Sequence, residues 1–287
     1  MRAFFALAFA VGMVACATPS EPLGPPAKEQ MWAVTADHQL IRFNGGQPQR
    51  ILSQKALQGL KPGEKVLGLD FRVARNQLYL LASSGQLYRV KPEQAQLEPL
   101  GAPVPLPAEG GQWGFDFNPT VDRIRVVHEG GANLRRHPET GAAVDGNPSA
   151  EGVQDDGALA FDAADPNAGR KPRIGAAGYT YNQQDEKLTT NYAIELAQGL
   201  LVTQGTKEGV SPAVSPNTGR LFTVGRLGVQ AARVQFDISD VRNAAYISVD
   251  ETAGDALYRV DLTTGQATRI ARIGTGGLQL LGLAIEP

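Results

Sequence analysis

Cysteine and histidine are scarce in this chain, and their scarcity limits the chemistry that it can carry out. Cys16 is the only cysteine among 287 residues, so no disulfide framework holds the fold together. The three histidines, His38, His128 and His137, stand in no metal-ligand pattern such as His-Glu-x-x-His. The chain also lacks a Gly-x-Ser-x-Gly nucleophile elbow and a phosphate-binding loop. The sequence therefore carries no conventional catalytic signature.

Excess charge of one sign is also lacking, and apolar runs are short. The 27 basic and 29 acidic residues nearly cancel, which gives no indication of nucleic-acid binding or of a polybasic membrane patch. An apolar run from Ala3 to Ala15 follows Arg2 and is too short to span a bilayer. Small residues lead from this run into Cys16, a pattern that is typical of an export signal.

The tetrapeptide Met13-Val14-Ala15-Cys16 resembles a bacterial lipobox, in which a peptidase cuts before the cysteine and the cysteine receives the lipid. We expect residues 1–15 to be a lipoprotein signal peptide. Residues 16–30, with four prolines, are expected to form a lipidated and extended tether. The lipobox places the protein in the bacterial cell envelope, on the outer membrane or the periplasmic face, held to the membrane by its lipid alone. The alternative is an ordinary secretory signal with an incidental cysteine.

A short motif recurs along the rest of the chain. Leu-x-Arg-x appears as LIRF at 40, LYRV at 87, LRRH at 134 and LYRV at 257. Before each copy stand runs rich in Val, Ile, Leu, Tyr and Phe, bounded by Gly, Pro, Asn and Asp, which are typical of β-strands. Residues 173–228 fit more loosely, as one expanded unit of four strands. Repeats of this kind predict one sheet per unit, packed against its neighbours.

The end of the chain supplies what its first unit lacks. LLGLAIEP, at 280–287, matches VLGLDFRV of the second unit but has no strand after it, while the first unit starts at MWAVTAD without such a strand. A last strand that completes the first sheet is how a propeller avoids an open edge. We therefore expect an all-β propeller over residues 31–287, with five blades, or six if residues 142–172 contain strands. An open stack of repeats leaves the terminal match unexplained.

Several segments resemble the bacterial domain family of unknown function DUF4394. They are GFDFNPTVDRIRVV (114–127), NLRRHPETGA (133–142), DGALAF (156–161), FDIS (236–239) and LYRVDLTTGQAT (257–268). The resemblance spans about residues 31–287 and implies an exported or surface-associated domain with no assigned activity. The segment AVDGNPSAEGVQDDG departs from the family pattern, which runs more directly into an Asp-Gly-Ala-Leu segment.

The third unit departs from its neighbours. In the second unit Tyr79 and Tyr88 are expected to face each other across a hairpin, and Tyr246 and Tyr258 repeat this choice in the last unit. The matching residues of the third unit are Arg125 and Arg135. The arginine of the tetrad, in contrast, recurs and is expected to serve the scaffold, as Arg42, Arg89, Arg136 and Arg259.

Two like charges facing each other destabilise a sheet, so the charge of the third-unit pair must be balanced. An internal carboxylate is one candidate, and an anionic ligand held by two guanidinium forks is the other. The carboxylates considered are Asp116, Asp122 and Asp156. The further ligand-binding candidates are Asn118, Arg123 and Asn133.

Asp70, Asp116 and Asp237 hold the same place in the first strand of their units, with Thr180 and Ala284 in the other two. In a propeller these innermost strands line the central channel. Converging carboxylates could bind Ca²⁺, which takes six to eight oxygen ligands. We favour the interpretation in which each carboxylate accepts hydrogen bonds from backbone amides and holds no metal or other cofactor.

The sequence thus favours a non-catalytic binding or assembly module, whose partner is a small anionic ligand or an unidentified envelope protein. The alternative is a propeller hydrolase or lactonase that uses a divalent metal in the central channel. The fold cannot decide between them, because propellers carry many functions.

If Cys16 is lipidated, Cys16→Ser should release the protein from the membrane fraction, since one acyl-bearing residue is the whole anchor. Fractionation followed by immunoblotting measures this release. Absence of labelled fatty acid from the wild-type protein would show that the lipobox interpretation is wrong.

Overall fold

The computed structural model describes residues 21–287. The predicted signal peptide and Cys16 lie outside these residues. The described part contains twenty β-strands and three 3₁₀ helices of three residues each, so the all-β prediction is confirmed. None of the helices in residues 21–287 is long and apolar enough to cross a membrane.

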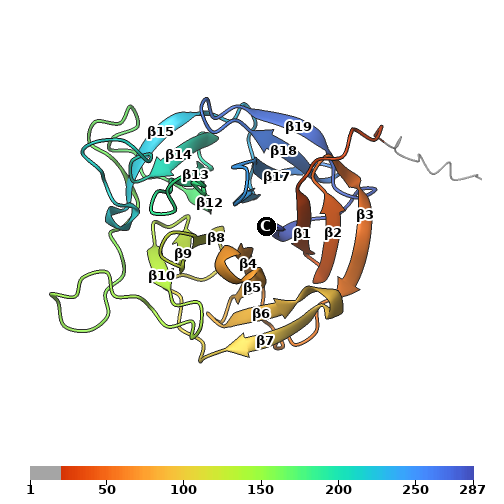
Figure 1. The fold of residues 1–287 in the computed structure, drawn as a ribbon, viewed down its shortest axis with the longest axis horizontal. Helices are drawn as coiled ribbons and strands as arrows, with labels where there is room; N and C mark the ends of the chain where they lie inside the picture. The colour runs from red at the N-terminus through yellow and green to blue at the C-terminus, as the bar shows by residue number, and fades with distance from the viewer. Residues whose placement is uncertain (1–20) are drawn as a thin grey trace, which may run out of the picture.

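Five sheets surround a common axis, and each is one blade (Figure 1). Blade 1 consists of β1 (Gln30–Thr35), β2 (Gln39–Asn44), β3 (Gln47–Ala56) and β20 (Leu280–Ile285). Blade 2 consists of β4 (Val66–Arg72), β5 (Gln77–Ala82), β6 (Leu87–Lys91) and β7 (Gln96–Leu100). Blade 3 consists of β8 (Trp113–Asn118), β9 (Arg123–His128) and β10 (Asn133–Arg136). Blade 4 consists of β12 (Ile174–Tyr179), β13 (Asn191–Glu195), β14 (Leu200–Gln204), β15 (Arg220–Arg226) and the short β11 (Ala160–Phe161). Blade 5 consists of β16 (Val234–Ile238), β17 (Ala245–Glu251), β18 (Gly254–Val260) and β19 (Ala267–Arg272).

The core lies between neighbouring blades. Because each sheet is covered on both faces, central strands such as β14 are buried along their whole length, whereas the outer strand β3 alternates with exposed residues. The apolar cluster between blades 1 and 2 includes Trp32, Leu69, Phe71 and Leu80. Each blade therefore depends on its neighbours for burial.

The innermost strands approach one another closely around the axis. A Cβ atom added to Gly68 would lie 2.3 Å from Cβ of Phe115 on the next blade, and one added to Gly282 would lie 2.7 Å from Cβ of Leu69. Such distances exclude any side chain. The glycines at these positions thus permit the narrow axis of the ring.

The ring is closed as the sequence predicts. Strand β20 pairs antiparallel with β1, with Trp32 opposite Ala284, so the last strand of the chain is the innermost strand of blade 1. Figure 1 shows the C-terminus near the axis beside β1. The pairing covers the edge that β1 would otherwise expose.

The long segment 142–172 forms no sixth blade. Its one strand, β11, pairs parallel with the outer strand β15 and extends blade 4. Blade 3 has three strands, followed by an isolated bridge between Arg136 and Ala143. The propeller therefore has five blades.

Contact with the propeller starts before Met31. Residues 21–29, part of the expected tether, lie against blades 1 and 5. The amide of Asn44 bonds both backbone groups of Ala27, and the buried Glu29 accepts a hydrogen bond from Tyr246 at 3.0 Å. Glu21 forms an ion pair with Arg269 at 2.9 Å.

Deletion of residues 279–287 should destabilise the whole ring, because it removes β20 and leaves the edge of β1 unpaired. Urea unfolding followed by tryptophan fluorescence measures the effect. Deletion of only 286–287 is the control, since it keeps β20 and removes the partly exposed pair of Glu286 with Arg42, a kind of pair worth about 0–1 kcal/mol. An unchanged unfolding midpoint after the longer deletion would contradict the closure argument.

Candidate functional site

Three aspartates meet at the propeller axis. Asp70 lies on β4, Asp116 on β8 and Asp237 on β16, each opposite the same position of the second strand of its blade. One carboxylate oxygen of each lies within 4.8 Å of the others, and all three side chains are buried. The three residues that the sequence assigns to the channel are thus brought together.

Each of these aspartates also joins two blades. Through Oδ2 it accepts a backbone N–H from the innermost strand of the next blade. The three bonds link Asp70 to Phe117, Asp116 to Tyr179 and Asp237 to Ile285. These bonds occupy one oxygen of Asp70 and one of Asp116, whereas both oxygens of Asp237 accept a backbone N–H, because Ile238 donates to its Oδ1. The carboxyl groups of Asp70 and Asp116 are also close enough to share a hydrogen bond with each other.

The other two blades lack an axial carboxylate. Gly178, not Thr180, holds the equivalent position in blade 4, because it pairs with Tyr192 as Asp70 pairs with Tyr79. The sequence comparison was wrong there by two residues. Ala284 holds the position in blade 1, as expected. The carboxylates are therefore unevenly distributed around the axis.

Burial governs the titration of this cluster. Among the ion pairs of residues 21–287, none includes one of the three axial aspartates. Burial raises the pKa of Asp237 to about 7, and burial together with the carboxylate of Asp116 raises the pKa of Asp70 well above its usual range. Burial also raises the pKa of Asp240, which follows β16, to about 9. A buried cluster of this kind either keeps protons at neutral pH or binds a cation.

A second candidate site lies between blades 3 and 4, where β8 ends and β9 begins. This arginine pocket has a volume of about 390 Å³, and its lining includes Asn118, Arg123, Arg125 and Arg135. Arg125 and Arg135 are direct partners on β9 and β10. Four of the five ligand-binding candidates from the sequence thus line one pocket, and Asn133 lies behind it.

The carboxylate of Asp156 lies between the two guanidinium groups. Its Oδ2 accepts hydrogen bonds from Nη1 of Arg125 at 2.5 Å and Nε of Arg135 at 2.8 Å, and its Oδ1 accepts one from Nη2 of Arg135 at 2.7 Å. The Asp156 side chain is 1% exposed. An internal carboxylate therefore lies between the two arginines and offsets part of their charge, and removing one partner of such a buried pair costs about 3–5 kcal/mol.

Arg125 is held inside the protein by further partners. It is 2% exposed, and it donates to the hydroxyl of Tyr179 at 3.2 Å and to Oδ1 of both Asn133 and Asn217 at 2.7 Å. Arg125 and Asn133 are thus fully engaged in the wall of the pocket. The candidates that remain partly exposed there are Asn118, Arg123 and Arg135.

The pairing register corrects the comparison between blades 2 and 3. Arg89, not Tyr88, lies opposite Tyr79. Because Arg135 lies opposite Arg125, it is the equivalent of Arg89, a scaffold arginine. Matching the leucines of LYRV and LRRH shifted the comparison by one residue, since the true counterpart of LYRV is Asn-Leu-Arg-Arg.

Arg125 is therefore the residue by which blade 3 differs. The four other blades carry an aromatic ring at this position: Trp32, Tyr79, Tyr192 and Tyr246. Arg259 lies over the ring of Tyr246 at 4.8 Å and Arg42 over the ring of Trp32 at 5.5 Å, which are cation–π contacts. In blade 3, Arg125 replaces the aromatic ring, and the scaffold arginine pairs with the carboxylate of Asp156 instead of lying over a ring.

Arg136 is not the scaffold arginine that the tetrad suggests. It lies opposite Ile124, at the apolar position that Val90 holds opposite Leu78 in blade 2. Burial lowers the pKa of its guanidinium, whose Nη2 donates to the carbonyl of Pro105 at 3.4 Å.

Sequence reasoning missed the residues that blade 4 places against Arg125 and Asn133. One row of cross-strand partners on β12, β13 and β14 consists of Tyr179, Asn191 and Gln204. This row contacts Arg125 and Asn133 through hydrogen bonds. Both side-chain polar atoms of Asn191 and Oε1 of Gln204 are buried without a partner in the described chain. Buried amides of this kind are normally satisfied by ordered water.

These features define a class: a closed five-bladed β-propeller with buried axial carboxylates and a basic pocket between two blades. The chain belongs to the family described as Domain of unknown function (DUF4394), whose model matches residues 39–284. No curated protein matches the chain.

Several solved structures are similar to the chain at low identity. A chain of a nidogen/laminin complex is 10% identical with a TM-score of 0.49, and the match covers 90% of this chain and 98% of that one. A putative 6-phosphogluconolactonase from Bacteroides uniformis is 14% identical with a TM-score of 0.38, covering 84% and 81%. A protein of unknown function from Bacteroides thetaiotaomicron is 14% identical with a TM-score of 0.45, covering 85% and 58%. Similarities of this extent say nothing about what the present protein binds.

Without divalent cations, the free energy of unfolding should fall as pH rises from about 4 to about 8. The folded protein binds more protons than the unfolded chain in this range, because the axial pKa values are raised only on folding. For Asp237 alone, a rise from 3.8 to about 7 corresponds to about 4 kcal/mol. Urea unfolding in the presence of EDTA measures the trend.

Asp116→Asn should flatten this fall, because the amide still accepts the N–H of Tyr179 but carries no charge. Asp185→Asn, at an exposed position, is the control and should follow the wild type. A free energy that rises with pH in the wild type would rule out raised axial pKa values.

Proposed function

We propose that the protein is a lipid-anchored, non-catalytic binding module of the bacterial cell envelope, which holds a small anion in the arginine pocket. One observation carries the proposal. Arg123, Arg125 and Arg135 line the pocket, and one carboxylate, that of Asp156, pairs with two of them, Arg125 and Arg135. The local surplus of positive charge favours a bound anion.

The arrangement of donors supports this function. Arg123 donates through Nη1 to the backbone carbonyls of its own turn. Asn118 accepts through Oδ1 the N–H groups of Thr120 and Val121. These bonds fix both side chains, while Nη2 of Arg123, Nη1 of Arg135 and Nδ2 of Asn118 have no partner within residues 21–287. Planar guanidinium groups match the oxygens of a carboxylate or a phosphate.

Asp156 has a separate role in the proposal. Because it holds Arg125 and Arg135 in place before any ligand arrives, binding would not have to overcome repulsion between two bare guanidinium groups. An incoming anion then contacts the outer edge of Arg135 together with Arg123. The pocket is thus preorganised by its own buried carboxylate.

Inorganic phosphate and succinate, added at constant ionic strength, should raise the melting temperature of the wild type, because a ligand of the native state stabilises it. Arg123→Gln should weaken binding roughly tenfold, as expected for one charge-assisted hydrogen bond. Arg50→Gln, on the exposed edge of β3, is the matched control and should bind like the wild type. Differential scanning fluorimetry and calorimetry provide the two measurements.

An unchanged melting temperature with both anions would refute the arginine pocket as an anion site. If Arg50→Gln and Arg123→Gln weakened anion binding equally, the effect would come from the change in net charge and not from the arginine pocket. The lipid anchor is tested separately by Cys16→Ser, so its failure leaves the pocket standing.

The alternative is a hydrolase or lactonase that uses a divalent cation at the axis. It is favoured by the approach of three carboxylate oxygens to within 4.8 Å of one another. Asp70, Asp116 and Asp237 would hold the ion, and a bound Ca²⁺ or Mg²⁺ would polarise a substrate oxygen. Adding CaCl₂ to the pH series is the test. A calcium-dependent rise in stability that grows with pH and is lost in Asp116→Asn supports the alternative, and its absence rejects it.

A further inference from the structure

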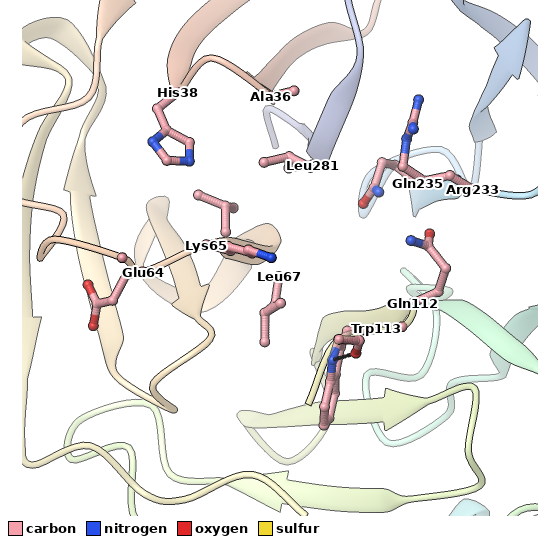
Figure 2. Close-up of a pocket in the computed structure, with 14 residues that line it drawn as sticks. Ala36, His38, Glu64, Lys65, Leu67, Gln112, Trp113, Arg233, Gln235 and Leu281 are labelled. Carbon is pink, nitrogen blue, oxygen red and sulfur yellow. Dashed lines mark hydrogen bonds between the residues drawn. The ribbon is translucent and has the colours of Figure 1, made fainter. Parts of the chain in front are cut away.

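A cavity of about 590 Å³ lies at the mouth of the axis, where the innermost strands begin (Figure 2). It lies at the opposite end of β8 from the arginine pocket, since Trp113 is the first residue of that strand and Asn118 the last. Blades 1, 2, 3 and 5 contribute its lining. The volume is within the range of small-molecule sites.

The floor of this mouth cavity is apolar. Leu67 of β4 and Leu281 of β20 point into it from neighbouring blades (Figure 2). Both side chains are only partly buried, so an apolar ligand group would remove further apolar surface from water. Below the floor, Gly68 and Gly282 bring the strands too close for a side chain. The cavity is therefore a cup with closely packed strands beneath its floor.

The rim of the cup is rich in hydrogen-bond donors. The ammonium group of Lys65 points toward the middle of the cavity, with Gln112 and Gln235 on the opposite side (Figure 2). In the described chain neither Lys65 Nζ nor the amide of Gln235 has a hydrogen-bond partner. Arg233 donates through Nη2 to Asp255 at 2.6 Å, and its Nε is buried without a partner.

One hydrogen bond fixes which group Gln112 offers. Its Oε1 accepts the backbone N–H of Val234 at 3.2 Å, a bond that joins blade 3 directly to blade 5. Because a backbone N–H can only donate, the amide orientation is set, and Nε2 remains as a donor. The rim thus presents a lysine and a fixed amide N–H.

Free acceptors are few. Glu64 is the one carboxylate in the lining, and its oxygens accept hydrogen bonds from Ser84, from Tyr88 at 2.7 Å and from the N–H of Lys61 at 2.9 Å. A polyhydroxylated ligand such as a sugar needs acceptors for its hydroxyl protons. An acceptor-rich anion needs only donors.

The aromatic residue of the cup also disfavours a sugar. Trp113 is 4% exposed, packs against the tilted ring of His128 with the ring centroids 4.3 Å apart, and donates its indole N–H to the carbonyl of Gly110. No broad ring face is therefore open for stacking by a sugar.

We propose that the mouth cavity binds an organic acid, with the carboxylate on Lys65, Gln112 and Gln235 and a small apolar body on Leu67 and Leu281. This site is independent of the arginine pocket. Two anionic ligands could therefore bind at opposite faces of the same propeller.

Calorimetric titration of the full chain with benzoate and hexanoate tests the proposal. Both acids should bind, and each should bind at least roughly tenfold more tightly than benzamide or hexanamide, because the amides lack the charge that Lys65 pairs with. Glucose should not bind. Lys65→Met should weaken benzoate binding roughly tenfold.

Lys61→Met is the matched control, since Lys61 is exposed on the same loop and outside the lining, and it should bind like the wild type. Arg123→Gln should also leave benzoate binding unchanged, which separates this site from the arginine pocket. Absence of binding by both acids at millimolar concentration would overturn the proposal. So would equal binding of acid and amide, or equal loss in the two lysine variants.

Discussion

The close approach of the five innermost strands around the axis is the constraint on which the rest of this structure depends. Where strands approach so closely, only glycine fits at positions such as Gly68 and Gly282, and a carboxylate on one strand reaches a backbone amide on the next. Asp70, Asp116 and Asp237 use that reach to join blades. The same geometry crowds their carboxyl groups together, so the cohesion of the blades and the raised pKa values have one cause.

The second strand of each blade shows how a repeat becomes specialised. Four blades place an aromatic ring there, and in three of them a scaffold arginine lies opposite the ring. This arrangement contributes about 0.5–2 kcal/mol where the guanidinium lies over the ring. Blade 3 places Arg125 at this position and takes Asp156 from a long connection to compensate. That exchange turns a packing contact into a charged, partly open pocket, and it fixes the long connection against blade 4.

The two proposed ligand sites follow from the ends of the inner strands. At their beginnings, loops from four blades surround an apolar floor, and donors such as Lys65 and Gln112 stand at the rim. At the end of β8, three arginines line the arginine pocket, and a buried carboxylate pairs with two of them. An apolar floor favours a ligand that has an apolar part, whereas a pocket lined by arginines favours a compact anion. The propeller thus offers different chemistry on its two faces.

Fold class, ring closure and the axial aspartates could be read from the sequence, because strand alternation and repeat spacing are local properties that survive without tertiary contacts. The sequence alone therefore determined a closed all-β ring and the position of Asp116 within it, whereas the folded chain decided between five and six blades. The sequence could not show the register of Arg135 or the equivalence of Gly178 with the axial aspartates. Residues one or two positions away also matched the repeat, so the true strand pairing could not be told apart from a shifted one. Only the folded chain decided that Asp156, distant in sequence from Arg125, supplies the counter-charge, and that Lys65 faces Gln235 across the mouth. Such contacts join different blades, and no local pattern encodes which side chains meet when the ring closes.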